Sequence, residues 1–272
     1  MKSLRAVGGG SINRSVEFTT RAGTRFFLKL NHASLLDMFE AEREGLAELS
    51  AADAVRVPVP LASGVVDDSA YLLLERLDMA SCADATAALL GERLAAQHRV
   101  TRTRFGWHRD NTIGSTPQLN TRCDSWVEFW RDARLGYQLE LAKTNGISSQ
   151  VLADGEELLG RLPEFFATYM PVPSLLHGDL WGGNWGALEN GEPVIFDPAV
   201  YFGDRETDIA MTLLFGGFGD GFLHAYEAAW PLDTGFPQRI ALYNLYHILN
   251  HYNLFGGGYQ AQAASLLERL LA

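Results

Sequence analysis

The sequence predicts an α+β protein of two lobes: a small N-terminal lobe built on an antiparallel β-sheet, and a larger, mainly α-helical C-terminal lobe. Two observations support this division. Short apolar strand patterns separated by turn residues fill the first part of the chain, interrupted by one helical stretch, whereas helical spacing dominates the rest. The boundary is expected near residue 78, which gives lobes at 1–78 and 79–272. At 272 residues and 47% apolar content, the chain is long enough to bury the cores of one large or two smaller domains.

The composition narrows the classes of function. A formal charge of −11 argues against a nucleic-acid surface, which needs a basic stripe. It allows a nucleotide ligand, because a phosphate site is built locally from backbone N–H groups, one lysine and metal ions. With only Cys82 and Cys123, no disulfide framework is predicted. The N-terminus lacks a signal-peptide core, and no apolar run reaches membrane-spanning length, so we expect a cytoplasmic protein.

A glycine turn opens the first lobe. Gly8 to Ser11 form the turn, and strands are expected at 16–20 and 24–30. Glycines let backbone N–H groups approach a phosphate, although most such runs are plain hairpin turns. Lys29 is a lone cation in the apolar strand FFLKL. It is either an edge-strand lysine whose ammonium reaches water or a lysine that holds nucleotide phosphates.

Helices follow. The first is expected over 35–51 and carries four glutamates, and a strand at 70–74 then runs into Glu75, Arg76 and Leu77. Further helices are expected at 84–99, 124–143, 150–170, 238–253 and 259–271. The aromatic residues of the 124–143 helix fit a core better than a ligand site. Between the helices, the loop FGWHRDNTIGSTPQ (105–118) holds more chemistry than a linker needs.

The chain is centred on the stretch from Ser174 to Val200, SLLHGDLWGGNWGALENGEPVIFDPAV. The pattern predicts the end of a buried strand, a polar loop, a turn and a second apolar strand that ends in an aspartate. Asn184 follows Asp179 by five residues, and Asp197 comes thirteen residues later. This spacing matches the kinase catalytic loop H-x-D-x-x-x-x-N, followed by a metal-binding aspartate at the end of a hairpin.

Phosphoryl transfer assigns a role to each residue of this stretch. Asn184 and Asp197 offer hard oxygen ligands for Mg²⁺, which leaves Asp179 to face the acceptor hydroxyl as the base. His177 is expected to support the loop. Asp208 opens an apolar helix, either as a simple cap or, as in kinase-like folds, by accepting backbone hydrogen bonds from the catalytic loop.

A kinase also needs a glutamate that pairs with Lys29. Glu42 is the first choice, since Leu46 falls one turn later on the neighbouring face, and Glu44 is the reserve. The strand that ends near Glu75 and Leu77 leads to the hinge, where backbone groups meet adenine. The rest of the protein-kinase pattern is missing: the chain has FDP in place of DFG and no A-P-E. A small-molecule kinase therefore fits better than a protein kinase.

A family resemblance is carried by GGGSIN (8–13), FLKLN (27–31), MFEAE (38–42), FGWHRDNTIGSTPQ (105–118), HGDLWGGN (177–184), FDPAVYFGDRETDIAMT (196–212), LFGGF (214–218) and LYHILNHYNLFGGGY (245–259). In these motifs the sequence resembles the fructosamine kinase (ketosamine-3-kinase) family, relatives of aminoglycoside phosphotransferases and choline kinases. This resemblance covers nearly the whole chain. It implies a protein-kinase-like fold and ATP-dependent phosphorylation of the 3-hydroxyl of the sugar on a glycated amine. The unstable 3-phosphate then releases the free amine, which amounts to deglycation.

The resemblance also implies contacts for each ligand. ATP is expected at Gly9, Gly10, Ser11, Ile12, Asn13, Lys29, Glu42, Glu75 and Leu77. Trp181 is placed to stack on the sugar, although a packed tryptophan is the simpler interpretation. His247, Asn250 and His251 are expected to border the same pocket; a metal site there is disfavoured because no HExxH is present. The glycine turn comes at residue 8, where family members usually carry a preceding helical segment, so a trimmed first lobe is expected.

Two alternatives to a ketosamine kinase remain open at this point. The first is another small-molecule kinase of the same fold, acting on an amino-sugar, choline or an aminoglycoside, because the carboxylates suit any hydroxyl acceptor. The second is a pseudokinase that only binds nucleotide, against which the joint presence of Lys29, Asp179, Asn184 and Asp197 argues. The acceptor is either a small glycated amine or a glycated protein, and the enzyme either a monomer or a homodimer.

Overall fold

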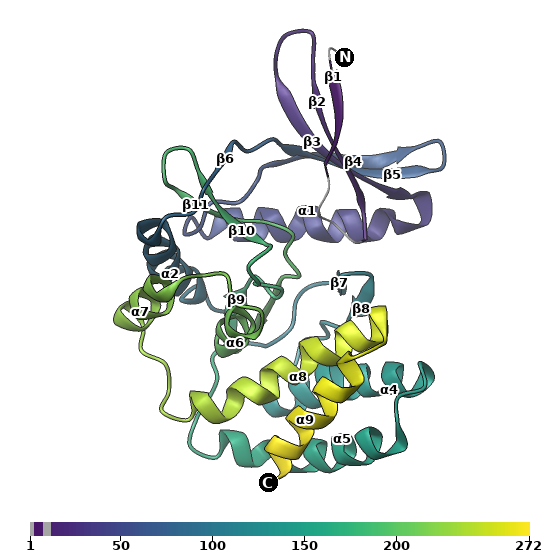
Figure 1. The fold of residues 1–272 in the computed structure, drawn as a ribbon, viewed down its shortest axis with the longest axis vertical. Coiled ribbons are helices and arrows are strands. Elements are labelled where there is room, and N and C mark those ends of the chain that lie inside the picture. Colours follow the sequence, from purple (N-terminus) through teal and green to yellow (C-terminus); the bar gives the residue numbers. More distant parts are fainter. Residues whose placement is uncertain (1–2, 8–11) are drawn as a thin grey trace.

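The computed structural model describes residues 3–7 and 12–272 and has the two expected lobes (Figure 1). In Figure 1 the strands of the N-terminal lobe lie at the top, above α1, and the long helices of the C-terminal lobe lie below. The upper sheet is antiparallel, with strand order β1-β2-β3-β5-β4. Its strands are β1 (Ser3–Val7), β2 (Arg14–Thr19), β3 (Arg25–His32), β4 (Pro60–Val66) and β5 (Ser69–Glu75).

The central position of β3 decides the environment of Lys29. Lys29 lies opposite Ser15 of β2 on one side and Leu72 of β5 on the other, and it is buried. The interpretation as an edge-strand lysine is therefore wrong, because both flanks of its strand are paired. The predicted glycine turn at 8–11 lies outside the described residues.

Helix α1 (Leu36–Ala51) separates the sheet from the lower lobe (Figure 1). It forms where predicted, after a 3₁₀ turn at Ala33–Leu35. Its apolar side buries Met38, Phe39, Leu46 and Leu49. Close to its middle, a Cβ on Gly45 would lie 3.1 Å from the side chain of Val200, so α1 packs closely against the segment that follows Asp197.

The lower lobe is mainly helical. Its helices are α2 (Asp84–His98), α3 (Trp126–Trp130), α4 (Gly136–Thr144), α5 (Ser149–Arg161), α6 (Glu206–Leu214), α7 (Asp220–Ala229), α8 (Phe236–Phe255) and α9 (Tyr259–Leu271). The sequence pattern missed α7. It also made one helix too long: α5 ends at Arg161, where a 3₁₀ turn begins, because Pro163 has no N–H to continue the helix.

The predicted helix at 124–143 is interrupted. A π-helical turn at Arg131–Leu135 separates α3 from α4. The turn carries Arg134, whose fully buried guanidinium donates to Leu119 O at 2.5 Å and Asn120 Oδ1 at 2.9 Å. The guanidinium carbon also lies 4.0 Å from the ring centre of Tyr201. These long-range contacts hold the irregular turn in place.

Short strands hold the segments on either side of the predicted catalytic loop. β9 (Ser174–Leu176) pairs with β12 (Tyr201–Gly203), and β10 (Trp185–Leu188) pairs with β11 (Pro193–Ile195) and β6 (Met79–Ala80). β7 (Asn111–Ile113) and β8 (Thr116–Gln118) form a small hairpin within the loop at 105–118. Of these, the sequence predicted the strand that ends at β9 and the apolar strand at β11.

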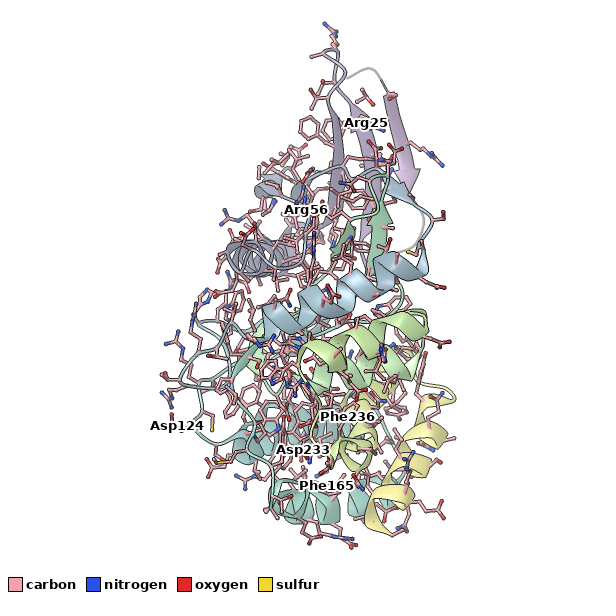
Figure 2. All side chains as sticks on the ribbon, turned by 90° about the vertical axis from the view of Figure 1, so that its left-hand side faces the viewer. Arg25, Arg56, Asp124, Phe165, Asp233 and Phe236 are labelled. Carbon is pink, nitrogen blue, oxygen red and sulfur yellow. The ribbon has the colours of Figure 1, made fainter. Side chains whose placement is uncertain are left out.

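The side view in Figure 2 shows the same two lobes with their side chains. In Figure 2, Arg25 and Arg56 lie in the upper lobe, whereas Asp124, Phe165, Asp233 and Phe236 lie in the lower lobe. Cys82 and Cys123 are free thiols. Throughout residues 3–7 and 12–272, every helix is too short or too polar to span a membrane.

Candidate active site

A cavity of about 490 Å³ opens between the two lobes. From the upper lobe it is lined by Ile12, Asn13, Lys29 and Glu42, and from the lower lobe by Asp179, Trp181, Asn184, Asp197, Asn250 and His251. Ten residues predicted from the sequence as parts of one site, and scattered from 12 to 251, therefore face one cavity.

Lys29 joins the two lobes across the cavity. Its Nζ lies 2.6 Å from Glu42 Oε1 and 2.7 Å from Asp197 Oδ1. Burial on its own lowers the pKa of Lys29, but the charges of Asp197 and Glu42 outweigh it and raise the pKa above its ordinary value. The lysine is therefore a fixed cation. The reserve residue Glu44 instead pairs with His108 and Arg109.

Asp208 fixes the start of the loop that carries Asp179. Its carboxylate accepts hydrogen bonds from His177 N at 2.7 Å and Gly178 N at 2.9 Å, as predicted. Gly178 has φ +85°, and a Cβ there would lie 2.0 Å from Ala199 O, so a larger residue would displace the loop. His177 contacts Phe196 O through Nε2 at 3.0 Å, which ties the loop to the segment before Asp197.

His98 completes this support, and sequence analysis missed it. Its Nε2 lies 3.2 Å from Asp208 Oδ2, and its Nδ1 lies 2.8 Å from Tyr226 Oη. Burial lowers the pKa of His98, so the ring is neutral, with Nε2–H donating to Asp208 and Nδ1 accepting from Tyr226. A histidine at the end of a predicted helix gives no sequence signal for this role.

Asp179 is one of the residues that line the cavity. Burial, followed by the charges of Asp197 and Asp208, raises the pKa of Asp179 to about 7. Asn184 Nδ2 donates to the backbone O of Asp179 at 2.9 Å and lies 3.4 Å from Oδ2. The Asp179 carboxylate therefore faces the cavity with a pKa near neutral pH, and Asn184 of the same loop helps to orient it.

The donor set beside Asp179 fits a hard divalent cation. Because Asn184 uses its amide nitrogen toward Asp179, its oxygen Oδ1 is left toward the cavity and accepts no hydrogen bond within the described part of the chain. Asp197 Oδ1 accepts a hydrogen bond from Lys29 Nζ, which leaves Oδ2 as a second oxygen ligand for a cation. Asp197 also has φ +57°, uncommon for a residue with a side chain and typical of strained functional positions.

Aromatic rings form one wall of the cavity. Trp181, 39% exposed, contacts Phe215 edge-on at 6.4 Å between ring centres, and His251 lies 5.3 Å from Phe215 and 5.1 Å from Tyr259. Phe215 and Tyr259 also line the cavity and were not predicted. Both stand inside motifs that carried the family resemblance, LFGGF and LFGGGY, which was the available signal.

Four residues that the sequence put forward for the site do not line the cavity. His247 of α8 is buried in the core and is not among the residues that line the cavity. Glu75 and Leu77 do not line the cavity either; the Glu75 carboxylate accepts from Arg56 Nη2 at 2.6 Å and Val59 N at 3.1 Å. Glu44 contacts His108 and Arg109 instead of Lys29. Gly9, Gly10 and Ser11 lie outside the described residues.

The fold and this arrangement define a protein-kinase-like, ATP-dependent phosphotransferase. A strand lysine paired with a helical glutamate, an aspartate in a loop, and asparagine and aspartate oxygens together match the parts that phosphoryl transfer requires.

The chain belongs to the fructosamine kinase family, since the family profile described as "Fructosamine kinase" matches residues 1–272. A probable ketoamine kinase of Synechocystis sp. is 44% identical, covering 100% of this chain and 91% of its own. The chloroplastic protein-ribulosamine 3-kinase of Arabidopsis thaliana is 42% identical, covering 98% and 82%. A solved structure of a fructosamine-3-kinase homologue from Haemophilus somnus 129PT superposes with a TM-score of 0.91 at 27% identity, covering 100% and 92%.

Proposed function

We propose that this chain is a ketosamine kinase that transfers a phosphoryl group from ATP to the 3-hydroxyl of ribulosamines or fructosamines. The observation that carries the proposal is that Asp179 lines the same cavity as the oxygen donors of Asn184 and Asp197 and the aromatic ring of Trp181. The names of the relatives, ketoamine kinase and protein-ribulosamine 3-kinase, support this acceptor class.

The residues of the site divide the work of the reaction. Asp179 accepts a hydrogen bond from the acceptor hydroxyl and takes its proton as the phosphoryl group arrives, a role for which a pKa of about 7 is suited. Lys29, held by Glu42, neutralises charge on the nucleotide phosphates. Asn184 and Asp197 would hold Mg²⁺, which would offset the negative charge of the nucleotide phosphates.

The aromatic wall binds the sugar in this proposal. Trp181 offers an exposed ring face to the C–H side of the ketose, and Asn250 and His251 offer polar contacts from α8. His251 Nδ1 donates to His247 O at 2.7 Å, which leaves Nε2 as an acceptor for a sugar hydroxyl or the amine.

An acceptor panel at fixed ATP and Mg²⁺ tests the proposal. We expect ribulose-lysine or fructose-lysine to be phosphorylated, with release of lysine as the 3-phosphate decomposes. The panel should vary the ketose from four to six carbons and compare free ketosamines with a glycated protein, and it should include choline and an aminoglycoside. Phosphorylation of either of these last two, with the ketosamines untouched, would move the chain to another acceptor class. ATP binding without any phosphorylated acceptor would favour the pseudokinase.

A further inference from the structure

Helix α1 is fastened to the lower lobe along one line of acidic residues. Asp37, Glu44 and Glu48 are spaced by seven and four residues, so they lie within about 40° of one another around the helix. Glu42, two residues before Glu44, points away from this line toward Lys29. One side of α1 therefore contacts Lys29 of the sheet, and another side contacts the lower lobe.

The partners of these acids come from a single segment of the lower lobe, residues 102–109. Glu44 receives His108 Nε2 at 2.7 Å on one oxygen and Arg109 Nη1 at 2.7 Å on the other. Arg109 also pairs with Asp37. Glu48 contacts Arg102 Nη2 at 3.1 Å and Trp107 Nε1 at 3.4 Å.

The acidic line and its partners work as a connected group. Partial burial raises the pKa of Glu44, but hydrogen bonds and charge from His108 and Arg109 lower it overall. A single exposed ion pair contributes little, whereas a carboxylate that accepts from two donors, as Glu44 and Glu48 each do, is held in a fixed geometry.

The segment at 102–109 is itself anchored to the catalytic frame. Gly106 exchanges two backbone hydrogen bonds of 2.9 Å with Phe202 of β12, the strand that pairs with β9 just before the catalytic loop. Gly106 has φ +95°, and a Cβ there would lie 2.5 Å from Asn120 O. This position therefore requires glycine. Backbone pairing thus links the partners of α1 to the strand beside His177.

We infer that Arg102, Trp107, His108 and Arg109, together with Asp37, Glu44 and Glu48 of α1, form an interlobe latch that positions Glu42 against Lys29. These are positioning residues, since none of them lines the cavity. The inference rests on the proposed role of Lys29 and Glu42 in binding ATP. It explains why the loop at 105–118 carries a histidine, an arginine and a tryptophan away from the cavity.

The test compares Arg109→Ala with Arg104→Ala. Arg104 stands in the same segment, and its ion pair with Asp124, at 2.7 Å, stays within the lower lobe. We expect Arg109→Ala to raise the KM for ATP about tenfold, with little change in the KM for the ketosamine. Arg104→Ala should leave both unchanged. Equal effects of the two variants would overturn the latch.

A second comparison separates positioning from a general loss of structure. In a Glu42→Gln background, Arg109→Ala should have little further effect on the KM for ATP, because the latch acts through Glu42. Additive losses would contradict the inference. If Arg109→Ala does not fold, Arg109→Lys takes its place, because lysine keeps the charge but cannot contact Glu44 and Asp37 through two separate nitrogens. We expect Arg109→Lys to raise the KM for ATP by less than tenfold. No rise in this KM would count against the latch. Failure of the wild-type protein to bind ATP would instead reject the proposed function.

Discussion

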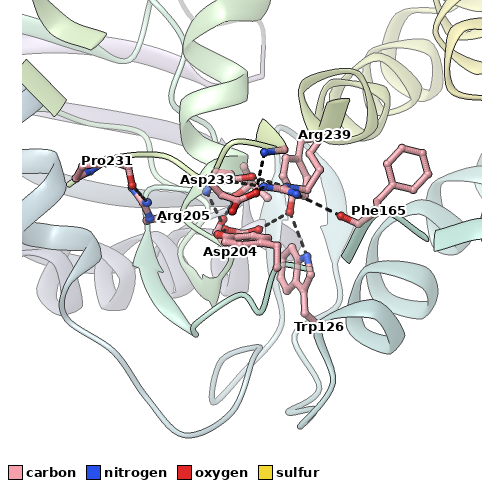
Figure 3. A network of polar contacts seen from close by, with 12 residues as sticks. Trp126, Phe165, Asp204, Arg205, Pro231, Asp233 and Arg239 are labelled. Carbon is pink, nitrogen blue, oxygen red and sulfur yellow. Dashed lines mark hydrogen bonds and ion pairs between the residues drawn. The ribbon is translucent and has the colours of Figure 1, made fainter. Parts of the chain in front are cut away.

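Two charged clusters in this molecule, both partly built from the stretch FDPAVYFGDRETD, behave in opposite ways. In the cavity, Lys29, Glu42, Asp179 and Asp197 leave oxygen donors facing open space. Around Asp204 in the lower lobe, the cluster shown in Figure 3 is closed on itself. The difference shows that a buried charge is a candidate for chemistry only where its hydrogen-bonding capacity is left incomplete.

The closed cluster satisfies each of its charges internally. Arg239 pairs with both oxygens of Glu206, at 2.7 and 3.1 Å, and with Asp233 at 2.7 Å (Figure 3). Asp204 accepts from Tyr243 Oη, from Tyr169 Oη at 2.8 Å and from Glu206 N at 3.0 Å. The cluster is therefore structural, although it stands four residues from Asp208.

The largest expected effect is on catalysis and comes from the open cluster. Asp179→Asn should lower kcat by about 10² to 10⁴, because the acceptor hydroxyl loses its proton acceptor. The free energy of unfolding at pH 8 should stay level or rise, since an ionised carboxylate is no longer buried beside Asp197 and Asp208. Steady-state kinetics and urea unfolding measure the two quantities. Asp124→Asn, at an exposed site, is the control; turnover near the wild-type level in Asp179→Asn would remove the residue from the base role.

The closed cluster should give the reverse pattern. Arg239→Ala leaves Glu206 buried without its partner, so we expect the free energy of unfolding to fall by about 3–5 kcal/mol. The turnover per folded molecule should change little. Arg131→Ala breaks an exposed pair with Asp132 and should cost under about 0.5 kcal/mol. A selective loss of turnover in Arg239→Ala, at unchanged stability, would contradict the division between the clusters.

A third prediction concerns a single buried group that belongs to neither cluster. His247 is buried, and its Nδ1 has no hydrogen-bond partner among the described residues; burial lowers its pKa from 6.5 to about 3. Because the unfolded chain takes up the proton first, the stability that neutral His247 contributes is present above pH 6.5 and is lost as the pH falls toward 3.

His247→Gln isolates this contribution. Between pH 7 and pH 5 the wild-type protein should lose about 2 kcal/mol more stability than the variant. Urea unfolding at the two pH values gives the comparison, and the remaining buried histidines cancel because both proteins contain them. Parallel losses in the two proteins would show that His247 is not held neutral.

The smallest effect should come from the wall of the open cluster. Trp181→Leu removes the ring face proposed for the ketose, so the KM for the ketosamine should rise about tenfold or less. The KM for ATP serves as an internal control and should not move. If the KM for ATP changes while that for the ketosamine is constant, Trp181 contacts the nucleotide side of the site instead.

Most of the open cluster could be predicted from the sequence because its spacing is local. Asp179 and Asn184 share one short loop, and Asp197 follows at the end of a hairpin, so their separation along the chain limits their separation in space. The predicted pairing of Lys29 with Glu42 and the predicted hydrogen bonds from the loop to Asp208 are both present in the structure. Both could be predicted because these residues occur along the chain in the order found in kinases.

Other features depend on segments that are distant in sequence and carry no local signal. His98 reaches Asp208 across 110 residues, and Arg109 reaches Glu44 across 65. The π-helical turn at Arg134 exists because its guanidinium is buried against Leu119 O and Tyr201, which helical periodicity cannot indicate. The short strands β7, β8, β10 and β12 are likewise stabilised by their partners rather than by propensity.

The sequence by itself thus indicated the class of chemistry, through residue types whose spacing and order match the parts of a phosphoryl-transfer site. The tertiary structure decided which charges remain open to a ligand and which are closed. It turned Glu44 from a candidate partner of Lys29 into part of the contacts that hold α1, and it placed His247 in the core. The physical reason is that side-chain chemistry is set along the chain, whereas burial and partners are set by packing between distant segments.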